Sequence, residues 1–316
     1  MPKHKKQHYV PACYLKAWCD IKSPPDQTPY LWFFEKGQKN GRRKSPNNIF
    51  HETDIYTIRD EVGGRDLTFE HSLSELEGLF SNIRNHKFKC HRNLTPVEHF
   101  TICVFIAAIH ARTKSQLKHM SDQWRKPLEK MDKLKEWMKT ASEKDKQTVF
   151  SMSHPSGANS KSFTYDQIKA MAEEPVRTIL LPTIQTVAPL LAKIDFAVLY
   201  TDATPGFITS DKPCVWFDPK GYKRHPFYRS PALMYETIEI TLPIAPEQCI
   251  FLNRRGINGY RYLPADWVKE FNRRTRFFAS EYYIVNQDYS DDAWFDPGVE
   301  PEDSWENEQA RKEDQS

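Results

Sequence analysis

The sequence predicts an α+β fold: a central helical bundle flanked by a mixed or antiparallel sheet that the N-terminal hairpin and the C-terminal strands build together. Three observations predict this class. Apolar residues recur at helical spacing through the middle of the chain, short β-rich runs follow residue 195, and an aromatic run with turn residues stands near the N-terminus. Segregation of helices and strands along a chain is typical of α+β proteins rather than of doubly wound sheets.

Helices are expected in the middle of the chain. Apolar residues from Phe69 to Ile83 repeat every three or four positions and predict an amphipathic helix over 67–84. Thr95, followed by Pro96 and Glu98, forms a capping-box pattern that starts a largely apolar and therefore buried helix. A charged helix, a polar loop and a helix interrupted by prolines are expected at residues 124–138, 141–163 and 164–194.

Strands are expected near both ends of the chain. The aromatic run 30–34, followed by Gly37 and Asn40-Gly41, predicts a strand that enters a hairpin. A second strand is expected at Ile55–Ile58. Later strands are expected at residues 196–201, 207–209, 215–217, 238–242, 249–252 and 282–285, with a helix at 266–276.

A chain of 316 residues can bury a sizeable core. We expect a single domain over residues 1–286, with lobes 1–140 and 164–286, and an acidic, disordered tail over 287–316. The net charge of +3 hides an asymmetry, because this tail holds eleven acidic and two basic residues. A basic body with an acidic tail suits a polyanion partner, with which the tail competes for the same basic surface. The alternative is a solvated tail that only aids solubility.

The composition also bears on location. The chain has no apolar run long enough to span a bilayer and no apolar segment after its first lysines, so neither a membrane association nor a secretory signal is expected. Its six cysteines show no CxxC spacing. Reduced thiols in a cytoplasmic protein are therefore expected rather than disulfides or a structural zinc site.

The familiar P-loop, dinucleotide, zincin, esterase and kinase motifs are absent, so candidate chemistry depends on dispersed polar residues. Glu70 and Glu77 are seven positions apart and so share one helix face, although acids on a helix more often face solvent. A water-activating Mg²⁺ or Mn²⁺ ion needs hard ligands such as carboxylates, with or without histidine. The predicted metal ligands are His8, Glu52, Asp54, Glu70 and Glu77.

The predicted catalytic residues are His8, Glu77, Arg112 and Asp211. His8 would act as general base or ligand, and Arg112 would hold a phosphate. The alternative for Arg112 is a buried charge paired with Glu70 or Asp211, because a charge on a buried helix needs a partner. If the site is catalytic, we expect His8 within hydrogen-bond or ligand reach of at least two acids.

Several motifs in order along the chain carry a resemblance to a known family. They are Gln7-His8-Tyr9-Val10-Pro11 with Tyr14-Leu15 and Trp18, Ser45-Pro46-Asn47-Asn48 with Glu52, Asp54 and Tyr56, the Glu70–Glu77 helix, Arg112-Thr113, Ser210-Asp211-Lys212-Pro213 and Leu242-Pro243-Ile244. On these residues the chain resembles a largely bacterial family known as domain of unknown function 4238, over about residues 4–285. Ala12-Cys13 departs from the family pattern. The resemblance implies a shared fold and a shared polar site, and it brings no established reaction. His8-Tyr9-Val10-Pro11 is also similar, more loosely, to the histidine segment of HNH nucleases, although no second-motif helix follows.

The leading hypothesis is a metal-assisted phosphodiester hydrolase, nuclease-like, used in bacterial defence against phages or rivals. The alternative is a non-catalytic module that binds nucleic acid or regulates a partner, with Tyr30 and Trp32 as stacking platforms. A third hypothesis gives the His8 region a structural role. The basic residues predicted to contact nucleic acid are Lys3, Lys5, Lys6, Arg42, Arg43 and Lys44.

Overall fold

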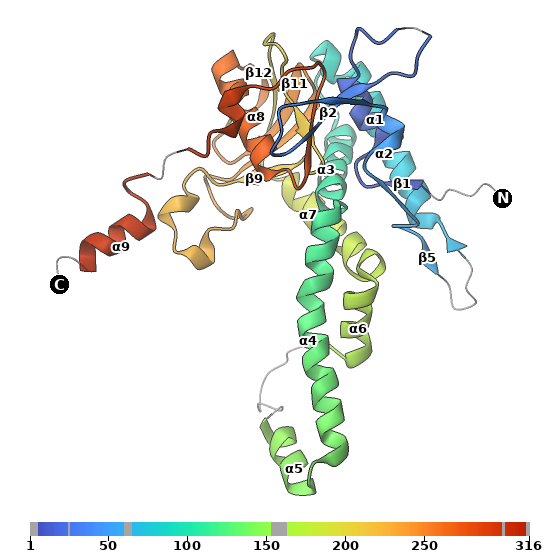
Figure 1. Ribbon diagram of the computed structural model, residues 1–316, viewed down its shortest axis with the longest axis vertical. Helices are drawn as coiled ribbons and strands as arrows, with labels where there is room; N and C mark the ends of the chain where they lie inside the picture. Colours follow the sequence, from blue (N-terminus) through green and yellow to red (C-terminus); the bar gives the residue numbers. More distant parts are fainter. Residues whose placement is uncertain (1–5, 25, 60–64, 153–162, 299–300, 314–316) are drawn as a thin grey trace. The chain divides into compact units, whose positions relative to one another are not determined.

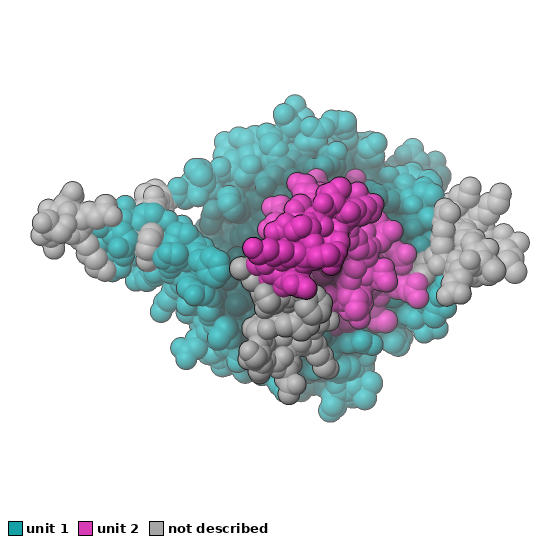
Figure 2. Space-filling model, turned by 90° about the horizontal axis from the view of Figure 1, so that it is seen from below, with its two compact units in different colours: residues 1–113, 184–316 teal, residues 114–183 magenta. Residues whose placement is uncertain are grey.

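The computed structural model describes residues 6–24, 26–59, 65–152, 163–298 and 301–313. The chain divides into two compact units (Figure 2): unit 1 comprises residues 1–113 and 184–316, and unit 2 comprises residues 114–183. These boundaries differ from the expected lobes 1–140 and 164–286. The reason is local packing, because residues 114–140 form a helix that packs against the helix at 165–173.

The secondary structure confirms the α+β class (Figure 1). The helices are α1 (Ala12–Leu15), α2 (Thr68–His86), α3 (Pro96–Ala111), α4 (Lys114–Thr140), α5 (Glu143–Met152), α6 (Tyr165–Glu173), α7 (Leu181–Leu191), α8 (Ala265–Phe278) and α9 (Trp305–Glu313). The strands are β1 (Lys6–His8), β2 (Leu31–Glu35), β3 (Arg42–Lys44), β4 (His51–Thr53), β5 (Ile58–Arg59), β6 (Arg65–Asp66), β7 (Asp195–Tyr200), β8 (Thr209–Ser210), β9 (Val215–Phe217), β10 (Glu239–Ala245), β11 (Gln248–Asn253), β12 (Gly259–Tyr262) and β13 (Tyr282–Val285).

Both larger sheets lie in unit 1. One has the order β12-β7-β11-β10-β9 and is antiparallel except for the parallel pair β7 and β12. Every residue of β10 and β11 is buried, including the polar Glu239, Thr241, Gln248 and Asn253. The other has the order β3-β2-β13-β8, so the N-terminal hairpin pairs with a C-terminal strand, as predicted.

The N-terminal segment is fastened to the C-terminal half of unit 1. Tyr14, Leu15 and Trp18 are fully buried. The Tyr14 hydroxyl donates to the carbonyl of Pro243 at 2.6 Å, and the Trp18 indole donates to the carbonyl of Phe207 at 2.8 Å. These bonds set α1 between the sheets and helix α2, with which it packs (Figure 1). The aromatic residues of this segment therefore serve the core.

Capping patterns in the sequence located the first turns of two helices. The capping boxes at Thr95 and Thr164 are both present, at the starts of α3 and α6. The expected loop 141–163 is wrong for its first part, because α5 forms there. The Ser142 hydroxyl accepts from the backbone N–H of Asp145 at 3.3 Å and so caps this helix. Residues 153–162 lie outside the described part of the chain.

Two other predictions differ from the structure. The strand expected at Ile55–Ile58 is wrong for residues 55–57, which belong to a turn between β4 and β5 that begins at Asp54 with a left-handed φ of 58°, whereas Ile58 begins β5. The tail expected to be disordered over 287–316 has ordered parts: the Trp294 side chain is buried in the cluster around Trp32, Phe34 and Tyr283, and the helix α9 forms further along. The burial of one large aromatic ring outweighs the high charge of its neighbours.

Candidate functional site around His8

The histidine of the N-terminal motif lies on a two-stranded ribbon made by β1 and β4. The register pairs His8 with His51 and Gln7 with Glu52. Directly opposite residues of an antiparallel pair point to the same face, and neighbours along a strand point to opposite faces. His8 and His51 therefore share one face, with ring centroids 5.4 Å apart, whereas Glu52 lies on the other face.

The other face of the ribbon holds a buried amide. Gln7 is fully buried, its Oε1 accepts from the backbone N–H of Tyr56 at 2.6 Å, and its Nε2 donates to the Thr57 hydroxyl at 3.1 Å. Sequence reasoning assigned no role to Gln7. The position of Gln7 directly before His8 could have indicated its burial. Successive side chains of a strand point to opposite faces, so one of the two neighbours points into the protein.

The His8 ring is held in one orientation with one nitrogen free. It donates a hydrogen bond to the backbone carbonyl of Asn47, and its Nε2 is buried without a hydrogen-bond partner, so the donor is Nδ1. Burial and the neighbouring His51 lower the pKa of His8, and these effects exceed the opposing effect of Glu77. At neutral pH the ring is therefore uncharged, and its Nε2 carries a lone pair that accepts no hydrogen bond.

An ion pair lies beside this ring. Arg112, which is 1% exposed, places Nη1 2.8 Å from Oε1 of Glu77. The Tyr56 hydroxyl donates to the Arg112 carbonyl at 3.1 Å, and the Cys13 Sγ lies 3.8 Å from Oε2 of Glu77. Nε of Arg112 is buried without a partner. We call His8, Cys13, His51, Glu77 and Arg112 the His8 site.

The thiol of this site is poorly suited to nucleophilic attack. Burial, and after it the charge of Glu77, raises the pKa of Cys13. A raised pKa keeps the thiol protonated at neutral pH, whereas the thiolate is the nucleophile. His8 is therefore the group in the site that is best prepared to move a proton.

Of the four predicted catalytic residues, the structure brings three together: His8, Glu77 and Arg112. Asp211 has another role: its carboxylate accepts the backbone N–H groups of Ser280, Glu281 and Tyr282 at 2.8, 2.7 and 3.1 Å. It fixes the chain where β13 begins. The partner of Arg112 is thus Glu77, rather than Glu70 or Asp211 as the alternative had it.

The predicted metal ligands are not gathered in one place. Among the described residues, no group of three or more histidine, cysteine, aspartate or glutamate side chains is arranged to hold a metal ion. Glu52 lies on the opposite face of the ribbon from His8, Asp54 lies in the turn after β4, and Glu70 lies in the first turn of α2, about 10 Å along the helix from Glu77. The charge of Glu77 acts on His8, but no acid is hydrogen-bonded to Nε2, so the expectation of two acids within reach is wrong.

The basic residues predicted to contact nucleic acid are divided among different places. Lys3 and Lys5 lie outside the described residues, and Lys6 is exposed on β1. Arg42 and Lys44 are exposed on β3, where Arg42 pairs with Glu35. Arg43 is different, because its guanidinium lies 4.8 Å from the centroid of the Tyr30 ring and 5.1 Å from that of Trp32.

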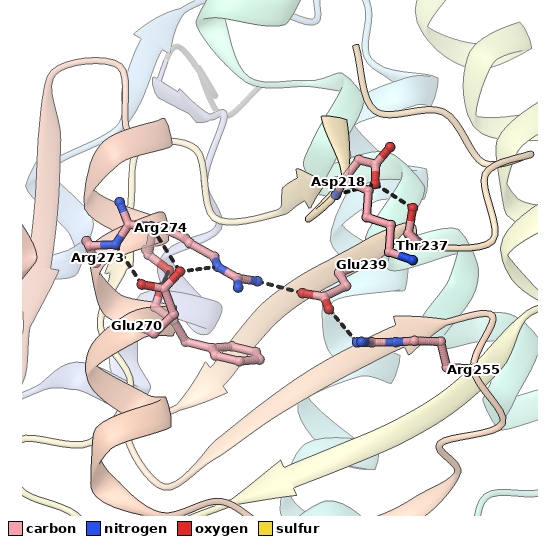
Figure 3. A network of polar contacts seen from close by, with 10 residues as sticks. Asp218, Thr237, Glu239, Arg255, Glu270, Arg273 and Arg274 are labelled. Atoms are coloured by element: carbon pink, nitrogen blue, oxygen red, sulfur yellow. Dashed lines mark hydrogen bonds and ion pairs between the residues drawn. The ribbon is translucent and has the colours of Figure 1, made fainter. Parts of the chain in front are cut away.

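Sequence reasoning missed a charged network on unit 1 (Figure 3). Glu239 on β10, which is 5% exposed, pairs with Arg255 and, at 2.5 Å, with Arg274 of α8. Glu270 in turn binds Arg273 and Arg274 at 2.6 and 2.7 Å (Figure 3). The i,i+4 spacing of Glu270 and Arg274 was the available signal. Each of these charges has an opposite charge as its partner, so the network acts as a structural tie between sheet and helix.

The fold and the site together define the class of this protein. It is an α+β protein in which a histidine nitrogen without a hydrogen-bond partner lies beside a buried ion pair. The chain belongs to the family described as protein of unknown function (DUF4238), whose family model matches residues 6–289. Comparison with the curated proteins and with the solved structures gives no match. Within the described residues, no helix combines the length and apolar character needed to cross a membrane.

Proposed function

We propose that unit 1 hydrolyses phosphodiesters, with His8 as the general base. The observation that carries this proposal is the buried, unpartnered Nε2 of His8, whose ring is held by the Asn47 carbonyl. A general base needs a defined tautomer, a free lone pair and a pKa below the working pH, and His8 has all three, although water and substrate must displace the groups that enclose Nε2 to reach it. The basic character of the chain before its acidic tail favours an anionic substrate.

In the proposed step, Nε2 of His8 accepts one proton from the attacking water while the oxygen of that water forms a bond to phosphorus. The bond to the leaving oxygen then breaks, and that oxygen takes a proton from solvent. Glu77 and Arg112 act on the charge state of the base in opposite directions, since the carboxylate raises the pKa of His8 and the guanidinium lowers it. The participation of Mg²⁺ or Mn²⁺ stays a prediction, and the assay below includes both ions.

His8→Asn is expected to lower the hydrolysis of single-stranded RNA or DNA about a hundredfold, because a positioned general base contributes about 10²–10⁴ in rate. The rate of the unaltered protein should fall as the pH drops below 6.5 and stay level above it, since the pKa of His8 is lowered from that value. Cleavage is measured with end-labelled oligonucleotides in Mg²⁺, Mn²⁺ or a chelator.

The matched control is His71→Asn, which replaces an exposed histidine on α2. It should leave the rate unchanged, and both variants should unfold at the temperature of the parent protein. Equal cleavage by the parent and His8→Asn under every ionic condition would refute the role of His8. Absence of cleavage by the parent protein in all three conditions would refute the hydrolase proposal itself.

We propose nucleic-acid binding as a second candidate function, because Arg43 lies over the rings of Tyr30 and Trp32. These side chains line a hollow of about 680 Å³ in which Lys22 and Arg43 are the cations and Asp20 and Asp288 the acids. Aromatic rings beside an arginine form a platform on which unpaired bases stack. The register pairs Arg43 with Trp32, so this platform is confined to one face of the hairpin.

Arg43→Ala is expected to weaken binding of a single-stranded oligonucleotide about tenfold, since stacking contributes about 1–3 kcal/mol per base. Fluorescence anisotropy across a salt series measures the affinity, whose dependence on salt should become shallower in the variant. Arg42→Ala serves as the control, because Arg42 is already engaged by Glu35. Equal losses in the two variants would contradict a platform centred on Arg43.

The six cysteines are free in the structure. This supports the proposal of a reducing, cytoplasmic location, since thiols persist there.

A further inference from the structure

A pocket of about 540 Å³ in unit 1 carries three cations from three segments of the chain. Lys16 follows α1, Arg84 belongs to the last turn of α2, and Lys89 lies in the short helix after it. The one acidic residue of the lining is Glu247, at the turn between β10 and β11. The lining therefore has an excess of positive charge.

The charge of Arg84 is buried and has no acid as its partner among the described residues. The side chain is 7% exposed, and its guanidinium donates to the carbonyls of Cys13 and Tyr14 at 3.0 and 3.2 Å. Carbonyl oxygens hold the guanidinium in position without neutralising it. A buried, uncompensated charge is costly, and an anion bound in the pocket would lower that cost.

One wall of the pocket is aromatic and held in place. His91 and Tyr200 line it, with ring centroids 4.6 Å apart. His91 also stacks on Tyr260, with ring centroids 4.7 Å apart and an interplanar angle of 13°. His91 adopts a left-handed φ of 49°, a conformation that a residue other than glycine rarely adopts and that the surrounding contacts must hold.

We propose that this pocket binds a mononucleotide. Its phosphate would contact Lys16, Arg84 and Lys89, its base would lie against the rings of His91 and Tyr200, and its ribose hydroxyls would donate to Glu247. Arginine and lysine are the usual phosphate partners, and a carboxylate is the usual acceptor for ribose hydroxyls. The volume suits a ligand of this size, since such pockets measure about 300–1,000 Å³.

This inference is independent of the hydrolase proposal, because the pocket lining contains no residue of the His8 site. The two sites nevertheless share helix α2. Glu77 and Arg84 are seven residues apart, which places them on the same face at a spacing of about 10 Å along the axis.

Isothermal titration of the full chain with each of the four ribonucleoside 5′-monophosphates tests the proposal. At least one is expected to bind with a Kd below about 1 mM, and inorganic phosphate and the matching nucleoside should each bind at least tenfold more weakly. The double variant Lys16→Ala/Lys89→Ala should weaken nucleotide binding at least tenfold. Glu247→Gln should reduce the preference for the ribonucleotide over its 2′-deoxy form.

The control is Lys220→Ala/Lys269→Ala, which removes two exposed lysines of unit 1 that do not line the pocket. It should bind as the parent does. The proposal is overturned if none of the four nucleotides binds, if inorganic phosphate or the nucleoside binds as tightly, or if the double variant of Lys16 and Lys89 retains full affinity. Thermal unfolding establishes that the variants are folded.

Discussion

Replacing Glu77 by alanine is expected to lower the free energy of unfolding by about 3–4 kcal/mol. Arg112 is 1% exposed, and Glu77 is the acid that compensates its charge at 2.8 Å. Removal of one partner from a buried pair leaves an uncompensated charge in a medium of low polarity, which costs about 3–5 kcal/mol. The lower part of that range applies because the Glu77 side chain is 23% exposed and partly solvated. Urea unfolding at neutral pH, followed by tryptophan fluorescence, measures the loss.

Two further variants separate charge from packing. Glu75→Ala on the exposed side of the same helix should change stability by less than about 0.5 kcal/mol. Combining Glu77→Leu with Arg112→Met should recover most of the lost stability, since apolar side chains of similar size replace a buried ion pair at little cost. A loss below about 1 kcal/mol in Glu77→Ala would show that Arg112 is solvated or finds another partner.

Stability is expected to fall by about 3 kcal/mol between pH 6.5 and pH 4 because of His110. Burial, and after it the charge of Lys212, lowers the pKa of His110 from 6.5 to about 4. The unfolded chain binds a proton near pH 6.5 that the folded chain does not accept until about pH 4. The stability that the neutral ring contributes is therefore complete above pH 6.5 and is lost on acidification, by about 1.4 kcal/mol for each pH unit.

His110→Phe isolates this effect. The His110 ring stacks on Trp216 at 4.7 Å and 22°, and phenylalanine keeps the aromatic contact while it removes the titrating group. Urea unfolding at several pH values should show a flatter dependence in this variant. His8 and His99, whose pKa values are also lowered, contribute a remaining slope. Replacement of the exposed His86 by glutamine should leave the dependence unchanged, and an unaltered slope in His110→Phe would contradict the assignment.

The sequence predicted the elements of the fold better than the members of the site. The helix at 67–84 and the strands at 215–217 and 282–285 were predicted from periodicity, and the structure has them at Thr68–His86, Val215–Phe217 and Tyr282–Val285. Such patterns depend on neighbours along the chain, so they can be interpreted without knowledge of the tertiary structure. His8, Glu77 and Arg112 were singled out because charged and titratable side chains stand out within apolar segments.

The grouping of those residues could not be predicted from the same patterns. Glu52 and His51 are neighbours in sequence, but alternation along β4 places only His51 on the His8 face. Asp211 has the chemistry of a catalytic acid, yet three backbone N–H groups from a distant segment engage it. The pairing of β1 with β4 and the packing of α1 and α2 decide these outcomes, and both depend on long-range contacts.

Hydrophobic periodicity and capping chemistry alone specified the α+β class, most of the longer helices and most strands after residue 195, because these signals act over a few residues. The helices α1, α5 and α9 were not predicted. Which polar side chains meet was decided by strand register and by the docking of the N-terminal segment on the C-terminal half of unit 1. A shift of one residue in register would exchange His8 for Gln7 on the face that carries His51. The free Nε2 of His8 and the uncompensated charge of Arg84 are therefore properties of the tertiary structure, since each depends on groups far away along the chain.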